Sequence, residues 1–288
     1  MQGKVRVAIV GPTGYTAYEA IRILLRHPQA QITALASRRD PQPHIDEIFP
    51  ALRGMIDLRC EPIDAKAIAH KADVALMCLP HVVAMESVPC FLQAGLKVID
   101  LSADYRLQNP ADYQQWYKHE HTDTRNLAQA VFGLPEYYRE QIRQARLIAN
   151  PGCYPTSAIL GIAPFVKRGL VEPGDVVISA GSGVSGAGKE TKPEHHFPER
   201  NETFEAYGVG THRHMIEIQR TLENIAGTSL NVLFVPHLVP MHRGILSTIV
   251  LKPKQPMTAE QAMDVLTERY KDEPFVRVRK DLPSTKDV

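Results

Sequence analysis

Short apolar segments alternate with helix-like segments through the first 150 residues, and this alternation constrains the fold more than any other feature of the sequence. The apolar segments occupy residues 5–10, 31–37, 73–79, 97–101 and 146–149. Apolar residues at helical spacing lie between them, as in residues 15–27 and 82–94. Strands that are apolar throughout are buried on both faces, and the helices between them are the crossovers that a parallel sheet requires. The first half of the chain is therefore predicted to form an α/β domain with a parallel sheet.

The pattern changes after Cys153, and a second domain is predicted from this point. Helices are expected at residues 154–168, 215–226 and 259–270, and strands at residues 175–180, 230–235 and 245–251. A glycine-rich segment covers residues 181–188, and the polar residues 189–206 are expected to form a long loop. These features favour an α+β domain with an antiparallel or mixed sheet. We therefore predict two domains, residues 1–152 and residues 153–288.

Charge and composition exclude several classes of protein. The 33 Lys and Arg residues nearly balance the 32 Asp and Glu residues, which gives no electrostatic sign of a nucleic-acid or anionic-membrane partner. Four cysteines without a CxxC pair do not form a dense disulfide framework. No apolar run approaches the roughly 18 residues of a membrane span, and the amino terminus lacks the features of a signal peptide. We expect a cytoplasmic protein.

The turn after the first strand has the pattern of a dinucleotide-binding site. Gly11-Pro-Thr-Gly-Tyr-Thr-Ala17 ends the strand and begins the first helix. Glycines there let backbone N–H groups approach a pyrophosphate, whose charge the helix amino terminus favours. The candidate cofactor-binding residues of this turn are Gly11, Thr13, Gly14, Tyr15 and Thr16. The alternative is a tight strand-to-helix turn that binds no ligand.

The end of the second strand indicates which dinucleotide binds. NAD-binding sites usually have an acidic residue at this point, which binds the ribose hydroxyls, but this sequence has Ser37, Arg38 and Arg39. A hydroxyl and two guanidinium groups suit a 2′-phosphate, so NADP is predicted. The alternative is a solvated basic loop.

Cys153 is the candidate nucleophile. It follows Pro151-Gly152 at the expected start of a helix, where the dipole and the backbone N–H groups favour a thiolate and can receive an oxyanion. A purely structural cysteine is the alternative. Cys78 and Cys90 lie among apolar residues, and both are expected in the core.

Thr211-His212-Arg213-His214 supplies a proton acceptor, because histidine exchanges protons near neutral pH. In an extended segment the two histidines would share a face, but no third ligand stands at a metal-binding spacing, so no metal site is predicted. One of the two histidines is expected to be structural. Arg213 and Arg243 are candidates for binding an anionic substrate.

Taken together, these motifs resemble those of the N-acetyl-γ-glutamyl-phosphate reductases of arginine biosynthesis. The resemblance runs nearly end to end and rests on the segments at residues 11–17, 100–106, 151–156, 182–188, 212–214 and 243–246. It implies an NADP-dependent reduction of N-acetyl-γ-glutamyl phosphate to N-acetylglutamate semialdehyde and phosphate. It also implies a Rossmann-type NADP-binding domain at residues 1–152, and a semialdehyde-dehydrogenase-like catalytic and oligomerisation domain at residues 153–288. A homodimer or homotetramer is expected.

The resemblance also implies roles for individual residues. Cys153 would attack the acyl phosphate, hydride would reduce the resulting thioester, and His212 would act as the acid and base. His214 would orient the substrate. The further cofactor-binding candidates are Pro80, Ser102, Ser185 and Gly186, and the further substrate-binding candidates are Arg106, Tyr207, Arg213 and Arg243.

The sequence departs from the family pattern in two places. Lys189 stands where many members have Arg, which keeps the charge but loses the planar fork. The family continues beyond the last residues found here with a strand and a helix that returns to the nucleotide domain, and this return segment is expected to be missing. The missing return segment leads to one alternative, a truncated, non-catalytic NADP-binding subunit. The other alternative is a related reductase of the aspartate-semialdehyde or lysine-pathway type, because those enzymes share the same chemistry.

Overall fold

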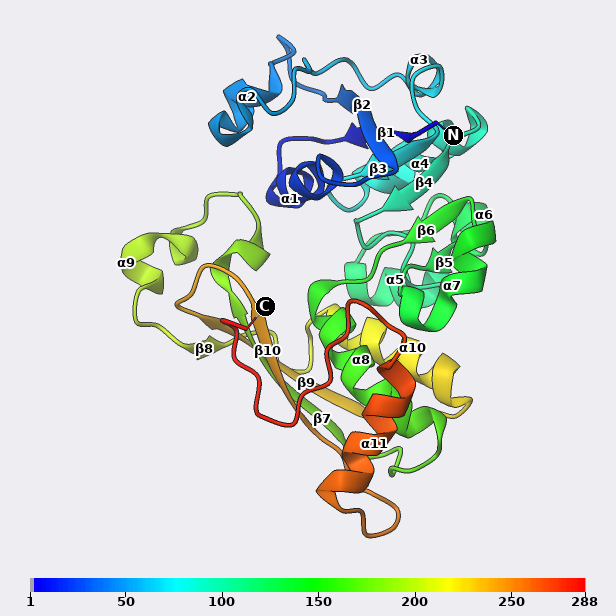
Figure 1. The fold of residues 1–288 in the computed structure, drawn as a ribbon, viewed down its shortest axis with the longest axis vertical. Coiled ribbons are helices and arrows are strands. Elements are labelled where there is room, and N and C mark those ends of the chain that lie inside the picture. The colour runs from blue at the N-terminus through cyan, green and yellow to red at the C-terminus, as the bar shows by residue number, and fades with distance from the viewer. Residues whose placement is uncertain (1–2, 288) are drawn as a thin grey trace. The chain divides into compact units, whose positions relative to one another are not determined.

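Two compact units make up the chain, residues 1–151 and residues 152–288. The computed structural model describes residues 3–287 (Figure 1). Among these residues, no helix combines the length and the apolar character needed to cross a membrane.

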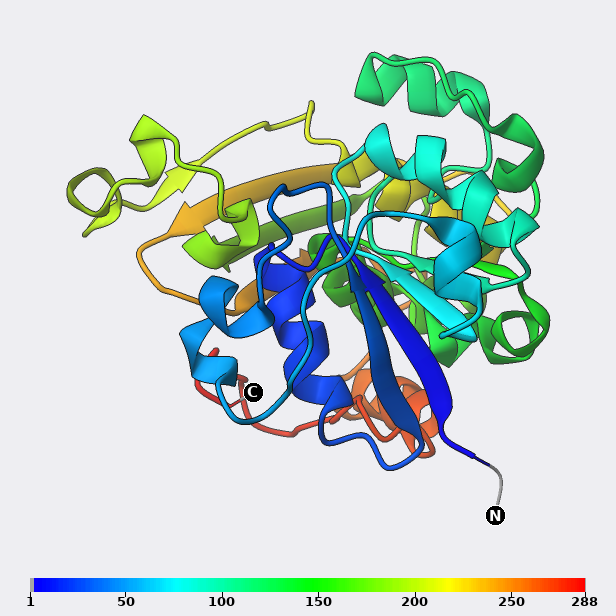
Figure 2. The same ribbon diagram turned by 90° about the horizontal axis from the view of Figure 1, so that it is seen from above.

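The first unit is built on a six-stranded sheet in the order β2-β1-β3-β4-β6-β5, and every strand pair in it is parallel. The strands are β1 (Val5–Val10), β2 (Ala30–Ala36), β3 (Val74–Met77), β4 (Lys97–Asp100), β5 (Val131–Phe132) and β6 (Leu147–Ala149). Figure 2 shows β1 and β2 side by side. The predicted parallel sheet is confirmed, and its order reverses between β1 and β3, where open sheets of this kind bind ligands at the carboxyl ends of the strands.

Helices cover both faces of this sheet. They are α1 (Tyr15–Leu24), α2 (Ile45–Ile48), α3 (Ala65–Ala69), α4 (Val83–Gln93), α5 (Pro110–Tyr117), α6 (Thr124–Leu127) and α7 (Pro135–Gln144), with a 3₁₀ turn at Pro50–Leu52. Successive residues of β1 serve different cores: Ala8 and Val10 pack in one apolar cluster, and Ile9 packs in another together with residues of α1. This two-sided burial explains why the strands are apolar throughout.

The second unit contains a four-stranded mixed sheet in the order β10-β7-β9-β8. The strands are β7 (Val176–Gly183), β8 (Glu205–Ala206), β9 (Val232–Val239) and β10 (Ile245–Val250). β7 and β9 are parallel, and the two edge pairs are antiparallel. The main helices are α8 (Cys153–Lys167), α10 (His214–Ala226) and α11 (Ala259–Tyr270). Of the two predicted arrangements, antiparallel or mixed, the structure has the mixed one.

The expected loop at residues 189–206 contains short elements instead. A 3₁₀ turn occupies Pro193–His195, α9 covers Phe197–Arg200, and β8 pairs with β9. Pro193 and Pro198 stand in the first turns of these two helices, where a missing N–H costs nothing. Helices of this length are too short for an apolar period to show in the sequence.

One face of the second sheet carries exposed apolar side chains. Val177 on β7, Leu233 on β9, and Leu246 and Val250 on β10 are all more than a third exposed. The register places Val177 beside both Leu233 and Val250, so these side chains share one face. The residues that alternate with them on β7 and β9 are buried on the opposite face, where α8 contacts β10 and α10 contacts β9.

Candidate active site

The glycine turn of the first unit lies at the carboxyl ends of β1 and β3. Gly11 has φ = +83°, and a Cβ added to it would lie 2.6 Å from the carbonyl oxygen of Cys78. Only glycine fits this left-handed conformation and close approach without strain. Gly14 caps α1 without a side-chain hydrogen bond, and Thr13, Tyr15 and Thr16 surround the helix start with at least partial exposure. The turn therefore presents the amino terminus of a ten-residue helix, as a phosphate-binding turn requires.

A pocket of about 650 Å³ lies at the end of β2. Its lining includes Ser37, Arg38, Arg39, Gln42, Glu86 and Cys90. The Ser37 hydroxyl accepts the backbone N–H of Arg39 at 3.1 Å, which holds the two arginines in a tight turn. Arg38 lies 3.9 Å from Glu86, and both side chains are more than half exposed. Such an exposed pair adds little stability, so Arg38 can bind an anion at small cost.

Cys90 is exposed, and the prediction that it lies in the core is wrong. Helix α4 turns Ala84, Met85, Val88 and Phe91 toward the sheet, which leaves position 90 on the pocket side. Cys78 is only partly exposed, and burial raises the pKa of its thiol to about 12. A thiol with so high a pKa is unreactive at neutral pH.

Ser102 is buried in a turn after β4. Its hydroxyl donates to Asp100 at 2.7 Å and accepts the N–H of Asp104 at 3.1 Å. Burial raises the pKa of Asp100 to about 6. Asp104 in turn accepts the N–H groups of Val82 and Met85 at the start of α4, just after Pro80. These bonds hold Val82 at φ = +70°, an unusual conformation for a β-branched residue.

Arg106 serves the backbone of the first unit. Its Nε donates to the carbonyl oxygen of Asn150 at 2.8 Å, and its Nη2 donates to that of Leu101 at 2.9 Å. The guanidinium therefore joins the turn after β4 to the segment that follows β6. The substrate-binding role implied by the family resemblance stays a prediction.

In the second unit, Cys153 stands at the first position of α8, as the sequence predicted, and it is exposed. The preceding Gly152 is the N-cap residue. Its N–H donates to Oε1 of Glu217 at 2.8 Å, and its carbonyl oxygen accepts the hydroxyl of Thr156 at 2.9 Å. The backbone just before the thiol is thus held on both sides.

The His214 ring packs directly on Gly152. A Cβ added to Gly152 would lie 2.8 Å from Cε1 and 2.9 Å from Cδ2 of that ring, and closer still to Nε2. Gly152 has an ordinary extended backbone, with φ = −66°, so glycine is required here by the ring and not by the backbone conformation. The structure therefore brings His214 beside the residue that precedes Cys153.

His212 lies next to His214, with ring centroids 4.9 Å apart, but the segment is not extended as expected. Arg213 is helical, with φ = −56° and ψ = −29°, and His214 begins α10. The Nδ1 of His212 accepts the N–H of His214 at 3.1 Å. Burial, and then the charge of Arg213, lower the pKa of His212 to about 4. His212 is therefore neutral at pH 7 and carries its proton on Nε2.

Tyr207 completes this group of side chains. Its hydroxyl lies 3.2 Å from that of Tyr154, which also donates to the carbonyl oxygen of His237 at 3.1 Å. Burial raises the pKa of Tyr207, the hydrogen bond with Tyr154 partly opposes this, and the nearby charge of Cys153 adds to the rise. The Tyr207 ring meets that of His212 edge-on at 5.5 Å.

The other candidates in this unit are Ser185, Gly186, Arg213 and Arg243. The N–H and hydroxyl groups of Ser185 both donate to the carbonyl oxygen of His242, which attaches the glycine-rich turn to the segment carrying Arg243. Arg213 and Arg243 are both exposed. Within residues 3–287, no group of three or more His, Cys, Asp and Glu side chains could hold a metal ion.

Glu217 was missed in the sequence. It is 1% exposed and lies one turn after His214 on the same face of α10. A carboxylate three residues after a candidate histidine, in the first turn of a helix, is the only signal that could have drawn attention to it. That signal is weak, because acidic residues are common at helix starts.

Two family models match the chain. The semialdehyde dehydrogenase NAD-binding domain matches residues 6–145, and the semialdehyde dehydrogenase dimerisation domain matches residues 153–288. Curated relatives named N-acetyl-gamma-glutamyl-phosphate reductase include that of Rhodopirellula baltica, 48% identical over 98% of this chain and 83% of the relative. The protein of Desulforudis audaxviator is 46% identical over 99% of this chain and 83% of its own length.

Solved structures share the fold. An aspartate semialdehyde dehydrogenase II from Vibrio cholerae, complexed with ASA, has a TM-score of 0.71 at 17% identity and covers 99% of this chain and 84% of its own. An aspartate semialdehyde dehydrogenase with NADP from Candida albicans has a TM-score of 0.69 at 16% identity, covering 94% of this chain and 76% of its own.

Proposed function

The chain belongs to the N-acetyl-gamma-glutamyl-phosphate reductase family, and we propose that it reduces N-acetyl-γ-glutamyl phosphate to N-acetylglutamate 5-semialdehyde and phosphate with NADPH, a step of arginine biosynthesis. The observation that carries the proposal is the arrangement around Cys153. An exposed thiol begins α8, and the His214 ring lies against the residue before it.

Cys153 is the proposed nucleophile. The amino terminus of α8 favours its thiolate, which attacks the acyl carbon to form a tetrahedral intermediate. Collapse of that intermediate breaks the bond from the carbon to the phosphate oxygen, releases phosphate and leaves a thioester on Cys153. Backbone N–H groups at the helix start are available to the oxyanion of the tetrahedral intermediate. Bound NADPH would supply the hydride that reduces the resulting thioester. Collapse of the thiohemiacetal then releases the aldehyde and returns the sulfur as a thiolate.

The geometry around Cys153 favours His214 as the acid and base, which reverses the roles implied by the motif. His214 packs on Gly152, the residue before Cys153, and Glu217 accepts the N–H of the same glycine. His212 has its Nδ1 occupied by a backbone N–H and a pKa lowered to about 4, so it is a poor base at neutral pH. We assign to His212 a hydrogen-bond donor role through Nε2, and to Tyr207 a place beside the substrate.

NADP is the proposed cofactor, and the residues of the first unit fit it. Gly11 and Gly14 open the turn to a pyrophosphate, and a pocket lined by Ser37, Arg38 and Arg39 follows β2. Two guanidinium groups and a hydroxyl there suit a 2′-phosphate.

The exposed apolar face of the second sheet supports a homo-oligomer. Val177, Leu233, Leu246 and Val250 lie on strands of the unit that matches the dimerisation domain. Contiguous exposed apolar side chains of this kind mark interaction sites in soluble proteins. We propose that a second copy of the chain covers this face, in a homodimer or homotetramer.

The test is an assay in the reverse direction, with N-acetylglutamate semialdehyde, phosphate and NADP⁺, following NADPH formation. We expect turnover that requires phosphate and is lost in Cys153→Ala, while that variant binds NADPH as the parent does. Turnover with aspartate semialdehyde alone would contradict the proposed substrate. Equal inactivity of the parent and Cys153→Ala, with NADPH binding kept, would favour the non-catalytic alternative.

A further inference from the structure

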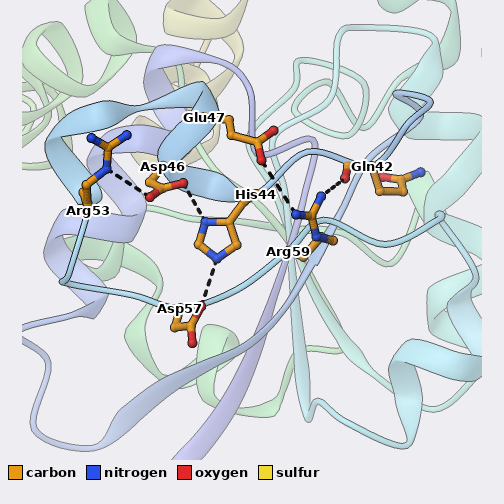
Figure 3. Close-up of polar contacts among 7 residues, drawn as sticks. All are labelled: Gln42, His44, Asp46, Glu47, Arg53, Asp57 and Arg59. Atoms are coloured by element: carbon orange, nitrogen blue, oxygen red, sulfur yellow. Dashed lines mark hydrogen bonds and ion pairs between the residues drawn. The ribbon is translucent and has the colours of Figure 1, made fainter.

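A group of polar residues between β2 and α3 shares only Gln42 with the site described above. We call it the His44 cluster (Figure 3), and its members are Gln42, His44, Asp46, Glu47, Arg53, Asp57 and Arg59. None of these residues has a part in the proposed chemistry. The cluster joins two stretches of chain, residues 42–47 and residues 53–59.

His44 contacts a carboxylate at each ring nitrogen. Its Nδ1 lies 2.7 Å from Oδ1 of Asp46, and its Nε2 lies 3.0 Å from Oδ1 of Asp57. An ionised carboxylate only accepts hydrogen bonds, and a neutral imidazole has a single N–H. Both contacts are therefore hydrogen bonds only when the ring carries two protons. The contact with Asp46, and then that with Asp57, raise the pKa of His44, while its burial acts in the opposite direction.

Further charges surround this arrangement. The Nε of Arg53 lies 3.3 Å from Oδ2 of Asp46. The Asp46 carboxylate therefore contacts both Arg53 and the protonated His44 ring. The contact with His44 is the largest cause that lowers the pKa of Asp46. Arg59 lies 3.7 Å from Glu47 and donates to the carbonyl oxygen of Gln42 at 2.7 Å. The groups that face the His44 ring directly are thus two acids, which favour its protonated form.

The cluster is connected to the pocket at the end of β2. Residues 58–61 are hydrogen-bonded to the end of that strand. The N–H of Glu61 donates to the carbonyl oxygen of Leu35, and the N–H of Ser37 donates to the carbonyl oxygen of Glu61, both at 2.8 Å. Residues 43–45 pair in turn with residues 58–60. Gln42 lines the pocket beside Arg38 and donates its side-chain N–H to the carbonyl oxygen of Ser37 at 3.3 Å.

We propose that His44 is a positioning residue for the nucleotide pocket. Its doubly protonated ring bridges Asp46 and Asp57, which connects residues 42–47 to residues 57–60 and so holds the pocket wall at Gln42. We call this pair of contacts the clasp. The inference rests on the proposed function in one respect, that this pocket receives the adenosine end of NADPH. When the His44 ring loses one proton, the lone pair of that nitrogen faces a carboxylate, and the contact with either Asp46 or Asp57 is no longer a hydrogen bond.

The direction of the pH dependence follows from the two shifted groups. His44 has its pKa raised, so its contribution is complete below about pH 6.5 and is lost as the pH rises through the raised value. Asp46 has its pKa lowered, so its contribution is lost only when the pH falls through that lowered value. The clasp is therefore closed below about pH 6.5 and opens as the pH rises through the raised pKa of His44.

Hydrogen exchange of the intact chain tests the clasp without any ligand. After correction for the intrinsic rate, we expect the amides of Ile45 and Cys60 to be about twofold to fivefold more protected at pH 6 than at pH 8.5, as for a partly exposed ion pair. His44→Gln should remove this dependence, and Asp57→Asn should move it to lower pH. His70→Gln is the matched control, because His70 is exposed on the same unit and lies outside the cluster. The proposal is overturned if His44→Gln keeps the parent's exchange profile.

NADPH affinity provides the second measurement. The ratio of the dissociation constants of His44→Gln and the parent should fall by about the same twofold to fivefold factor between pH 6 and pH 8.5. Taking this ratio cancels the titration of the cofactor's own phosphate. A constant ratio together with pH-dependent exchange overturns the positioning role. If neither protein binds NADPH, the proposed function fails, and the exchange data still decide whether the clasp exists.

Discussion

Gly152→Ala tests the contact between His214 and the residue before Cys153. The added methyl group would lie 2.8 Å and 2.9 Å from two ring carbons of His214, whereas carbon atoms pack at about 3.5–4.0 Å. The ring, or the backbone at the start of α8, must therefore move by about 1 Å. A displacement of this size at a reacting group costs about 100-fold in rate, and overpacking costs about 1–3 kcal/mol of stability.

The assay is steady-state turnover at saturating NADPH, together with thermal unfolding and NADPH affinity. We expect kcat to fall about 100-fold while NADPH affinity stays unchanged, because the proposed pyrophosphate and 2′-phosphate contacts lie in the first unit. Gly174→Ala is the neutral control, because an added Cβ there would meet nothing within 4 Å. Gly161→Ala is the control for overpacking. It would place a Cβ 2.6 Å from the Ile249 side chain, and it lies about 12 Å along α8 from the thiol at 1.5 Å per residue.

The result that would refute this reasoning is a Gly152→Ala variant with the turnover of Gly174→Ala. That outcome would mean that the ring and the thiol do not work as a unit. A Gly161→Ala variant that loses as much kcat as Gly152→Ala would show that the loss comes from general destabilisation of α8.

Three further predictions concern separate parts of the chain. Arg38→Ala should weaken NADPH binding by about 1–3 kcal/mol, as for a charged hydrogen bond, and leave NADH binding nearly unchanged in a fluorescence titration; equal losses would exclude a 2′-phosphate contact. The pKa of His212 is lowered to about 4, so the stability of the parent should decline as the pH falls from 6.5 toward 4, by at most about 3 kcal/mol. Urea unfolding should show a smaller loss of stability between pH 6.5 and pH 4 for His212→Gln than for the parent, and an equal loss in both would assign the effect to another group. Val250→Lys places a charge on the exposed apolar face of the second sheet and should reduce the mass measured by sedimentation, whereas an unchanged mass would place the subunit interface elsewhere.

Much of the fold was predictable because its signals are local. The apolar strands of the first unit show in the sequence because both faces of a parallel sheet are buried. Helix α5 was missed, although Asn109 caps it and Pro110 begins it, because its residues carry no clear apolar period. The short elements at residues 193–206 were missed because helices and strands of so few residues have no measurable period.

The candidate site was predictable only in part, for a related reason. Cys153 and the Gly11 turn are recognisable because each depends on its immediate neighbours, a strand end and a helix start. The sequence could not distinguish His214 from His212, since both stand within one short segment. Their different environments arise from the packing of α10 on α8.

The sequence by itself determined where the backbone must turn tightly, which strands are buried, and which side chain is the candidate nucleophile. These properties depend on residues that are adjacent or one helical turn apart. Only the tertiary structure decided that His214 lies on Gly152, that Glu217 holds the same glycine, that Arg106 binds backbone carbonyl oxygens and that Cys90 faces a pocket. Each of these outcomes depends on how separate elements pack together, and a hydrophobic period specifies which face of a helix is buried but not which residues it meets there.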